Sequence, residues 1–290
     1  MNWKVRSNLW LYGLTRYWLH GVIVFWLVFA TLPWMAPVLM KLGATGPASA
    51  IYRMYTPMCH RFPFRSFFLF GEQAAYPLAA AETELVPFEA YAGQSRIPYE
   101  MRAGLLPRPP FGVRTLPEFA VAYTQRVEGA PGGVAAVPIE IPPDLTPHTP
   151  EEAVNFARVQ LTSSIFIGNE AMGYKTAVCE RDLSIYAGLG LAALIYAIPA
   201  VRRKLRPLPI WLYFFIGVVP IGIDGFSQLL SYAPFSLWPT RETTPAFRVL
   251  TGFLFGLATG WLGYPNVGLS MRDTRRVIEA KLQAAGIIRK

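Results

Sequence analysis

The chain has 290 residues, of which 53% are hydrophobic and only 16% are charged, and its net charge is +9. A soluble domain of this length does not normally bury so much apolar material, so the composition argues against an ordinary soluble enzyme and indicates an integral membrane protein. The positive charge lies in basic segments around an acidic block, which fits membrane topology and an anionic lipid surface better than nucleic acid.

Four windows are apolar and long enough to cross a bilayer, which takes about 20 residues. They are residues 17–40, 183–201, 207–230 and 246–264. The first window is longer than the roughly 7–15 apolar residues of a secretory leader, so we expect a retained anchor. The expected fold is therefore an all-α integral membrane protein, a four-helix transmembrane bundle with an extracytoplasmic insert between the first two spans. In chain order the predicted segments are an N-terminus (1–16), the first span (17–42), an outer segment (43–73), the insert (74–178), spans two to four (179–264) and a basic tail (265–290).

Lysine and arginine near the ends of the spans predict the orientation of the chain. Basic residues precede the first span, form the run RRKLR between the second and third spans, and follow the fourth span. The insert instead holds eleven acidic and seven basic residues. We therefore expect both termini in the cytoplasm and the insert outside.

The insert is rich in proline and too long for an ordinary loop. One helical signal starts at Thr149, which can cap a helix with Pro150 at its first position and Glu152 completing a capping box. We expect a small, partly irregular insert packed on the membrane surface.

The only two cysteines are predicted to lie on the same side of the membrane. Cys59 and His60 follow the first span, and Cys179 comes just before the second. Some link between the two cysteines is expected, because about 120 residues separate them.

Asp224 stands about sixteen residues along the third span, which places it near the outer end. Gln228 follows one helical turn later on the same face. Because an ionisable group inside a span is costly, we expect Asp224 to form an ion pair, with Arg248 or Arg65 preferred and Arg181 as a further candidate.

The fourth span carries glycines at every fourth position: Gly252, Gly256 and Gly260. This spacing predicts close approach of a neighbouring helix. The neighbour is either the second span, with Gly188 and Ala192 as its small residues, or another protein.

Four ordered blocks resemble a prokaryotic membrane-protein family known as domain of unknown function 2085. The blocks are CHRFPFRSFFLFG from Cys59, VCERDLSIYAG from Val178, DGFSQ from Asp224 and RVLTG from Arg248. The resemblance implies a multi-pass protein of a prokaryotic plasma membrane with no established activity. Many relatives have a cysteine at the position of Asp182, and they join the first two blocks by a short loop, so Asp182 and the insert are departures.

Two interpretations of the cysteines stay open. In the first, Cys59, His60, Cys179 and Asp182 bind one metal ion, with zinc expected from the mixed sulfur, nitrogen and oxygen donors; the family-like arrangement of Cys and His favours it. In the second, Cys59 and Cys179 form a disulfide, as two cysteines outside the cytoplasm commonly do. No cofactor other than the zinc ion is expected.

The sequence has no phosphate-binding loop, dinucleotide fingerprint, HExxH motif or nucleophile elbow, and we predict no catalytic residue. The expected function is a non-catalytic accessory or scaffold subunit of a larger, energy-transducing electron-transport membrane complex. Its partners would be the lipid bilayer and other subunits, with no nucleic acid. The alternative is a membrane-embedded, metal-dependent enzyme or small-solute transporter with an outward pocket around Asp224, Arg65 and Arg248.

Overall fold

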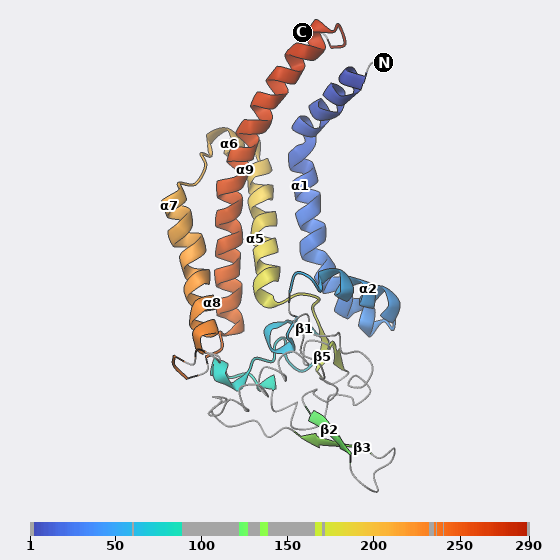
Figure 1. The fold of residues 1–290 in the computed structure, drawn as a ribbon, viewed down its shortest axis with the longest axis vertical. Coiled ribbons are helices and arrows are strands. Elements are labelled where there is room, and N and C mark those ends of the chain that lie inside the picture. The colour runs from blue at the N-terminus through green and yellow to red at the C-terminus, as the bar shows by residue number, and fades with distance from the viewer. Residues whose placement is uncertain are drawn as a thin grey trace. The chain divides into compact units, whose positions relative to one another are not determined.

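The computed structural model describes residues 3–59, 61–88, 122–126, 134–138, 166–169, 172–231, 235, 237–239 and 241–288. The chain divides into two compact units. Unit one comprises Met1–Thr31, Ser184–Ile221 and Leu250–Lys290, and unit two comprises Leu32–Leu183 and Gly222–Val249. Most of the described residues are helical (Figure 1).

The long helices are α1 (Trp3–Lys41), α5 (Glu180–Ala197), α8 (Val219–Ser231) and α9 (Pro245–Ala284). The short helix α7 (Ile210–Tyr213) and a π-helical turn (Phe214–Val218) lead directly into α8. Two further short helices are α2 (Thr45–Tyr55) and α6 (Pro199–Lys204).

Three described helices are long and apolar enough to cross a membrane: Val5–Lys41, Ile210–Ser231 and Pro245–Ala284. The predicted second span corresponds to α5, which is not among them. This helix has only 18 residues, three of its first residues are charged, and it stops before Pro199 begins α6. Its whole length is about 27 Å, short of the roughly 30 Å hydrocarbon core. The structure thus has three candidate membrane-spanning helices, and the predicted four-span bundle is not confirmed.

Two helices extend beyond the apolar windows that predicted them. Helix α1 starts at Trp3, well before residue 17, and continues through Pro33 and Pro37. Helix α9 continues past residue 264 through the basic tail to Ala284. Lysine and arginine are good helix formers, so a hydropathy window marks where a helix is apolar rather than where it ends.

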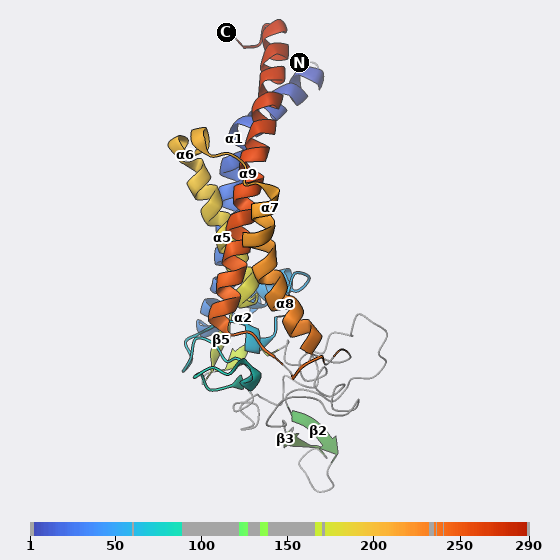
Figure 2. The same cartoon turned by 90° about the vertical axis from the view of Figure 1, so that its left-hand side faces the viewer.

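In unit one, α5 and α9 pack closely side by side (Figures 1 and 2). A Cβ on Gly256 would fall 2.2 Å from the backbone oxygen of Ile185, and one on Gly260 would fall 2.4 Å from the Cβ of Ala192. On the other helix, a Cβ on Gly188 would fall 2.6 Å from the oxygen of Phe253. The neighbour of the glycine face is therefore α5, the first of the two alternatives.

In unit two, a small antiparallel sheet joins the segment just before the insert to the end of the insert. Its strand order is β1 (Phe68–Leu69), β5 (Gly173–Lys175) and β4 (Gly168–Asn169), with Phe68 opposite Lys175. Strands β2 (Ala122–Arg126) and β3 (Val134–Pro138) form a separate antiparallel pair. A buried cluster beside the small sheet consists of Phe62, Phe64, Phe68, Tyr76, Leu78, Phe88, Phe166 and Met172.

The last glycine of the first motif block has a clear steric role here. A Cβ on Gly71 would fall 1.9 Å from the backbone oxygen of Met172. A side chain at Gly71 would thus push apart the two segments that the sheet joins. The helix predicted from Thr149 and the side chain of His60 lie outside the described residues.

Candidate functional site

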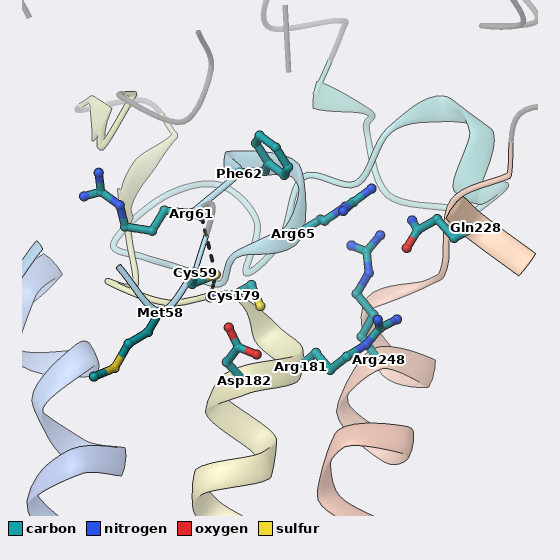
Figure 3. A pocket seen from close by; sticks show the side chains of 10 residues that line it. All are labelled: Met58, Cys59, Arg61, Phe62, Arg65, Cys179, Arg181, Asp182, Gln228 and Arg248. Atoms are coloured by element: carbon teal, nitrogen blue, oxygen red, sulfur yellow. Dashed lines mark hydrogen bonds between the residues drawn. The ribbon is translucent and has the colours of Figure 1, made fainter. Parts of the chain in front are cut away.

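The structure brings the two cysteines together at the start of α5. Cys59 lies shortly after α2, Cys179 immediately precedes α5, and Asp182 is in the first turn of that helix. The two sulfur atoms and a carboxylate oxygen of Asp182 all lie within 4.8 Å of one another. Both cysteines are free thiols of intermediate burial, and their side chains lie beside that of Asp182 (Figure 3).

Two backbone N–H groups are directed at the sulfur of Cys59. The N–H groups of Arg61 and Cys179 each donate to Cys59 Sγ over 3.4 Å. Arg61 adopts a φ of 54°, in the left-handed region that non-glycine residues rarely occupy, and this conformation accompanies the turn that directs its N–H back to Cys59. The strained turn therefore forms part of the sulfur's binding environment.

The pKa values of the two thiols are shifted in opposite directions. A hydrogen bond between the side chains lowers the pKa of Cys59, and the same bond, together with burial, raises the pKa of Cys179 well above its usual value. The thiolate is the form of cysteine that binds metals and reacts with disulfides.

A ring of hydrogen bonds fixes the turn that follows Cys59. The buried Lys175 Nζ donates to the carbonyl of Arg61 over 2.5 Å, and Tyr52 Oη donates to the carbonyl of Lys175 over 2.5 Å. Arg61 Nη1 in turn donates to the carbonyl of Tyr52 over 3.1 Å. Burial lowers the pKa of Lys175 well below its usual value. This ring connects α2, the turn and β5.

Asp224 is 1% exposed and forms an ion pair, but not with the two preferred partners. Arg181 donates a short hydrogen bond to its Oδ2, and Thr243 Oγ1 donates to its Oδ1 over 2.7 Å. Arg241 Nη2 lies 3.6 Å from the same Oδ1. One buried carboxylate thus faces two guanidinium groups and a hydroxyl group.

The arginines preferred for Asp224 pair instead with Glu242, which is 4% exposed. Arg65 donates to its Oε1 over 2.5 Å, and Arg248 and Gln228 both donate short hydrogen bonds to its Oε2. Arg248 Nη1 also lies 3.6 Å from Glu180 Oε2.

Glu180 is fully buried, and its 3.6 Å separation from Arg248 is too long for a hydrogen bond. Burial raises the pKa of Glu180 to about 7, and Arg248 partly offsets that effect. Sequence reasoning missed both Glu180 and Glu242. The signals available were the position of Glu180 next to Cys179 and that of Glu242 in the stretch TRETTPAFR that leads into α9.

A cavity of about 220 Å³ is lined by the two cysteines, by Asp182 and by several of the arginines described above. The thiols and Asp182 lie at one end, and the guanidinium groups of Arg65, Arg181 and Arg248 gather at the other, next to Gln228 (Figure 3). The guanidinium group of Arg61 points away from them (Figure 3). The lining residues are Met58, Cys59, Arg61, Phe62, Arg65, Cys179, Arg181, Asp182, Gln228 and Arg248.

Comparison with known proteins agrees with the motif blocks. Residues 161–262 match the sequence profile of a family described as a predicted membrane protein, domain of unknown function 2085. An uncharacterized protein of Methanocaldococcus jannaschii is 34% identical over 87 residues, which are 29% of this chain and 48% of the relative, so the chain spans about half the length of that curated relative. No solved structure matches. The predicted resemblance is thus confirmed over residues 161–262, which carry three of the four blocks, and identifies this chain as similar to a membrane-protein family of unknown function.

Proposed function

We propose that this chain is a membrane protein that holds one divalent transition-metal ion between Cys59, Cys179 and Asp182. The supporting observation is that two sulfur atoms and a carboxylate oxygen lie within 4.8 Å of one another. Ligands at typical zinc distances of about 2.0–2.3 Å would need only a small closing movement from that arrangement. Zinc suits this mixed donor set, and His60, adjacent to Cys59, is the proposed fourth ligand.

Such an ion would act as a clamp rather than as a catalyst. It would link two positions that are 120 residues apart and lie at the two ends of the segment containing the insert. The two N–H groups directed at Cys59 Sγ also favour a thiolate at that position. The alternative clamp is a disulfide between the same two sulfurs, and it needs neither His60 nor Asp182.

Elemental analysis of the full chain, purified in mild detergent, tests the metal. We expect about one zinc ion per chain, and substantial loss of it in Cys59→Ser, Cys179→Ser and Asp182→Asn variants, because each change removes a ligand. Met58→Leu is the matched control, since it removes a neighbouring sulfur that is not a thiolate. A wild-type protein without metal, in which mass spectrometry after alkylation shows both cysteines oxidised to each other, would establish the disulfide instead.

The role as an accessory or scaffold subunit of an electron-transport complex remains a prediction. The glycine face of α9 no longer supports it, because that face packs against α5 of the same chain. The acidic insert and the basic tail are the features that still favour a partner. Purification from native membranes in mild detergent tests it: co-purification of stoichiometric chains would support the role, and recovery of this chain alone would count against it.

A further inference from the structure

One segment of unit one carries four basic side chains that face the surroundings of the protein. The run Arg202–Arg206, with the sequence RRKLR, comprises the end of α6 and the start of the link to α7 (Figure 1). Its four basic residues are all exposed: Arg202, Arg203, Lys204 and Arg206. Within the part of the chain that the structure describes, none of the four forms an ion pair with a carboxylate.

Unit one has little negative charge of its own to balance these side chains. It contains thirteen lysine and arginine residues but only two acidic residues, Asp273 and Glu279. Both acidic residues pair along α9, Asp273 with Arg276 and Glu279 with Arg275, each over 3.7 Å. The positive charge of the run is therefore available to an anionic partner.

The run lies where the apolar parts of two spanning helices end. The candidate span Ile210–Ser231 begins four residues after Arg206. The indole Nε1 of Trp261 donates to the carbonyl of Arg206 over 3.1 Å, and Trp261 lies in the last turn of the apolar window 246–264 of α9. The run is therefore at the depth of the lipid headgroups, where tryptophan is also enriched.

Specific contacts hold the run in place. Leu205, its only apolar residue, packs against a buried cluster of unit one that consists of Leu19, Ala192, Ala193, Tyr196 and Tyr264. The N–H of Leu205 donates to the carbonyl of Val201 over 2.8 Å, at the end of α6. Basic residues beside a span also set the topology of a membrane protein, but that role requires no such anchoring in the folded chain.

We propose that the run Arg202–Arg206 binds the headgroups of anionic phospholipids. Clustered lysine and arginine residues at the membrane surface attract anionic lipids, and guanidinium groups donate paired N–H bonds to phosphate oxygens. A zwitterionic headgroup brings its own positive charge and so offers less attraction. The site is independent of the proposed metal, because the run belongs to unit one and the proposed metal ligands belong to unit two.

Thermal unfolding of the full chain, purified in an uncharged maltoside detergent, tests the proposal. Phosphatidylglycerol and phosphatidylcholine with the same acyl chains are added separately to the micelles. A ligand that binds the folded state raises the unfolding midpoint, so we expect phosphatidylglycerol to raise it well above the value with phosphatidylcholine. The difference should shrink as the salt concentration rises from about 0.05 M to about 0.5 M, because salt screens exposed charges. Equal midpoints with the two lipids at low salt would overturn the proposal.

A triple variant tests whether the run itself is responsible. Arg202→Gln, Arg203→Gln, Lys204→Gln should weaken phosphatidylglycerol binding on the order of a hundredfold, because each basic residue near an anionic surface contributes about fivefold. The matched control, Arg272→Gln, Arg275→Gln, Arg276→Gln, removes the same charge from α9 beyond its apolar window and should retain most of the affinity. Unfolding midpoints without lipid confirm that both variants fold. Full retention in the first variant, or an equal loss in the control, would overturn the proposal.

Inorganic phosphate distinguishes a lipid headgroup from a soluble anion. At equal ionic strength, phosphate should leave the unfolding midpoint close to its value in chloride, because the site acts at a membrane surface and encloses no free ion. A stabilisation by phosphate equal to that by phosphatidylglycerol would assign the run to a soluble anion and overturn the inference.

Trp261→Phe tests whether the run must be held in place. The variant keeps an aromatic ring but loses the hydrogen bond to the carbonyl of Arg206, so it should weaken phosphatidylglycerol binding about fivefold without changing the net charge. Trp10→Phe is the control, because Trp10 is 67% exposed. Equal affinities of the two variants for phosphatidylglycerol would overturn the argument that a fixed run, rather than basic charge alone, forms the site.

Discussion

The two units of this chain differ in the contacts that each has in its own interior. Unit one packs α5 against α9 by removing side chains, so that backbone meets backbone at Gly188 and Gly256. Unit two instead buries charge, with Asp224, Glu242 and Arg248 all less than 5% exposed. Close backbone packing therefore distinguishes the first unit, and buried ion pairs distinguish the second. The two should therefore respond differently to substitution.

The largest effect is expected from Asp224→Leu in unit two. This change leaves the half-buried guanidinium of Arg181 without the buried carboxylate of Asp224 and removes the acceptor of Thr243. Breaking a buried pair from one side costs on the order of 3–5 kcal/mol of unfolding free energy. Thermal unfolding in mild detergent measures it, and an unchanged midpoint would show that Asp224 is solvated.

A double variant sharpens that result. The double variant Asp224→Leu, Arg181→Met removes both charges and should recover part of the lost stability, because a buried pair replaced by apolar groups is often neutral. Recovery should be incomplete, since Arg241 also lies 3.6 Å from Asp224. If the double variant is less stable than the single one, the stranded charge is not the cause.

The second-largest loss of unfolding free energy is expected from Gly256→Ala in unit one. The added Cβ would fall 2.2 Å from the backbone oxygen of Ile185, so the two helices must separate. Overpacking of this kind costs about 1–3 kcal/mol. Gly263→Ala on the same helix is the control, because a Cβ there meets nothing within 4 Å and alanine favours the helix. Equal stabilities of the two variants would contradict close helix packing.

The packing of unit one could be predicted more fully than the ion pairs of unit two. The spacing of Gly252, Gly256 and Gly260 is local and can be seen along one helix, and Gly188 was named as a facing residue. By contrast, the ion-pair partners of Asp224 depend on which distant segments of the chain the fold brings next to α8. Arg241 lies 17 residues beyond Asp224 in a stretch without periodicity, and nothing local distinguishes it from a solvated arginine.

Only part of the candidate site could be predicted from the sequence, because the rest depends on contacts between distant segments. The two cysteines were expected together because the spans place them on one side, and the structure does bring them together with Asp182. Glu242 was missed because an acidic residue in a loop is usually exposed. Only the fold shows that Arg65, Gln228 and Arg248 surround it, at sequence separations from 6 to 177 residues.

A smaller loss of unfolding free energy is expected from Tyr52→Phe in unit two. This variant tests a hydrogen bond between neutral groups rather than an ion pair. The hydroxyl donates to the buried carbonyl of Lys175 over 2.5 Å and helps to hold the turn after Cys59. Loss of one such hydrogen bond costs about 1 kcal/mol. Tyr17→Phe is the control, because Tyr17 is 56% exposed. A loss as large as that of Asp224→Leu would show that the ring of hydrogen bonds, rather than the ion pairs, dominates unit two.

The smallest effect is expected from Asp273→Asn in unit one. Asp273 and Arg276 form an ion pair of 3.7 Å on α9, but their side chains are 76% and 80% exposed. Water and salt screen such a pair, so its loss should cost less than about 0.5 kcal/mol. The pair has the same chemistry as Asp224 with Arg181, and the two differ mainly in burial. A cost for Asp273→Asn comparable to that of Asp224→Leu would mean that burial does not make the charges of unit two important, and the contrast between the units would fail.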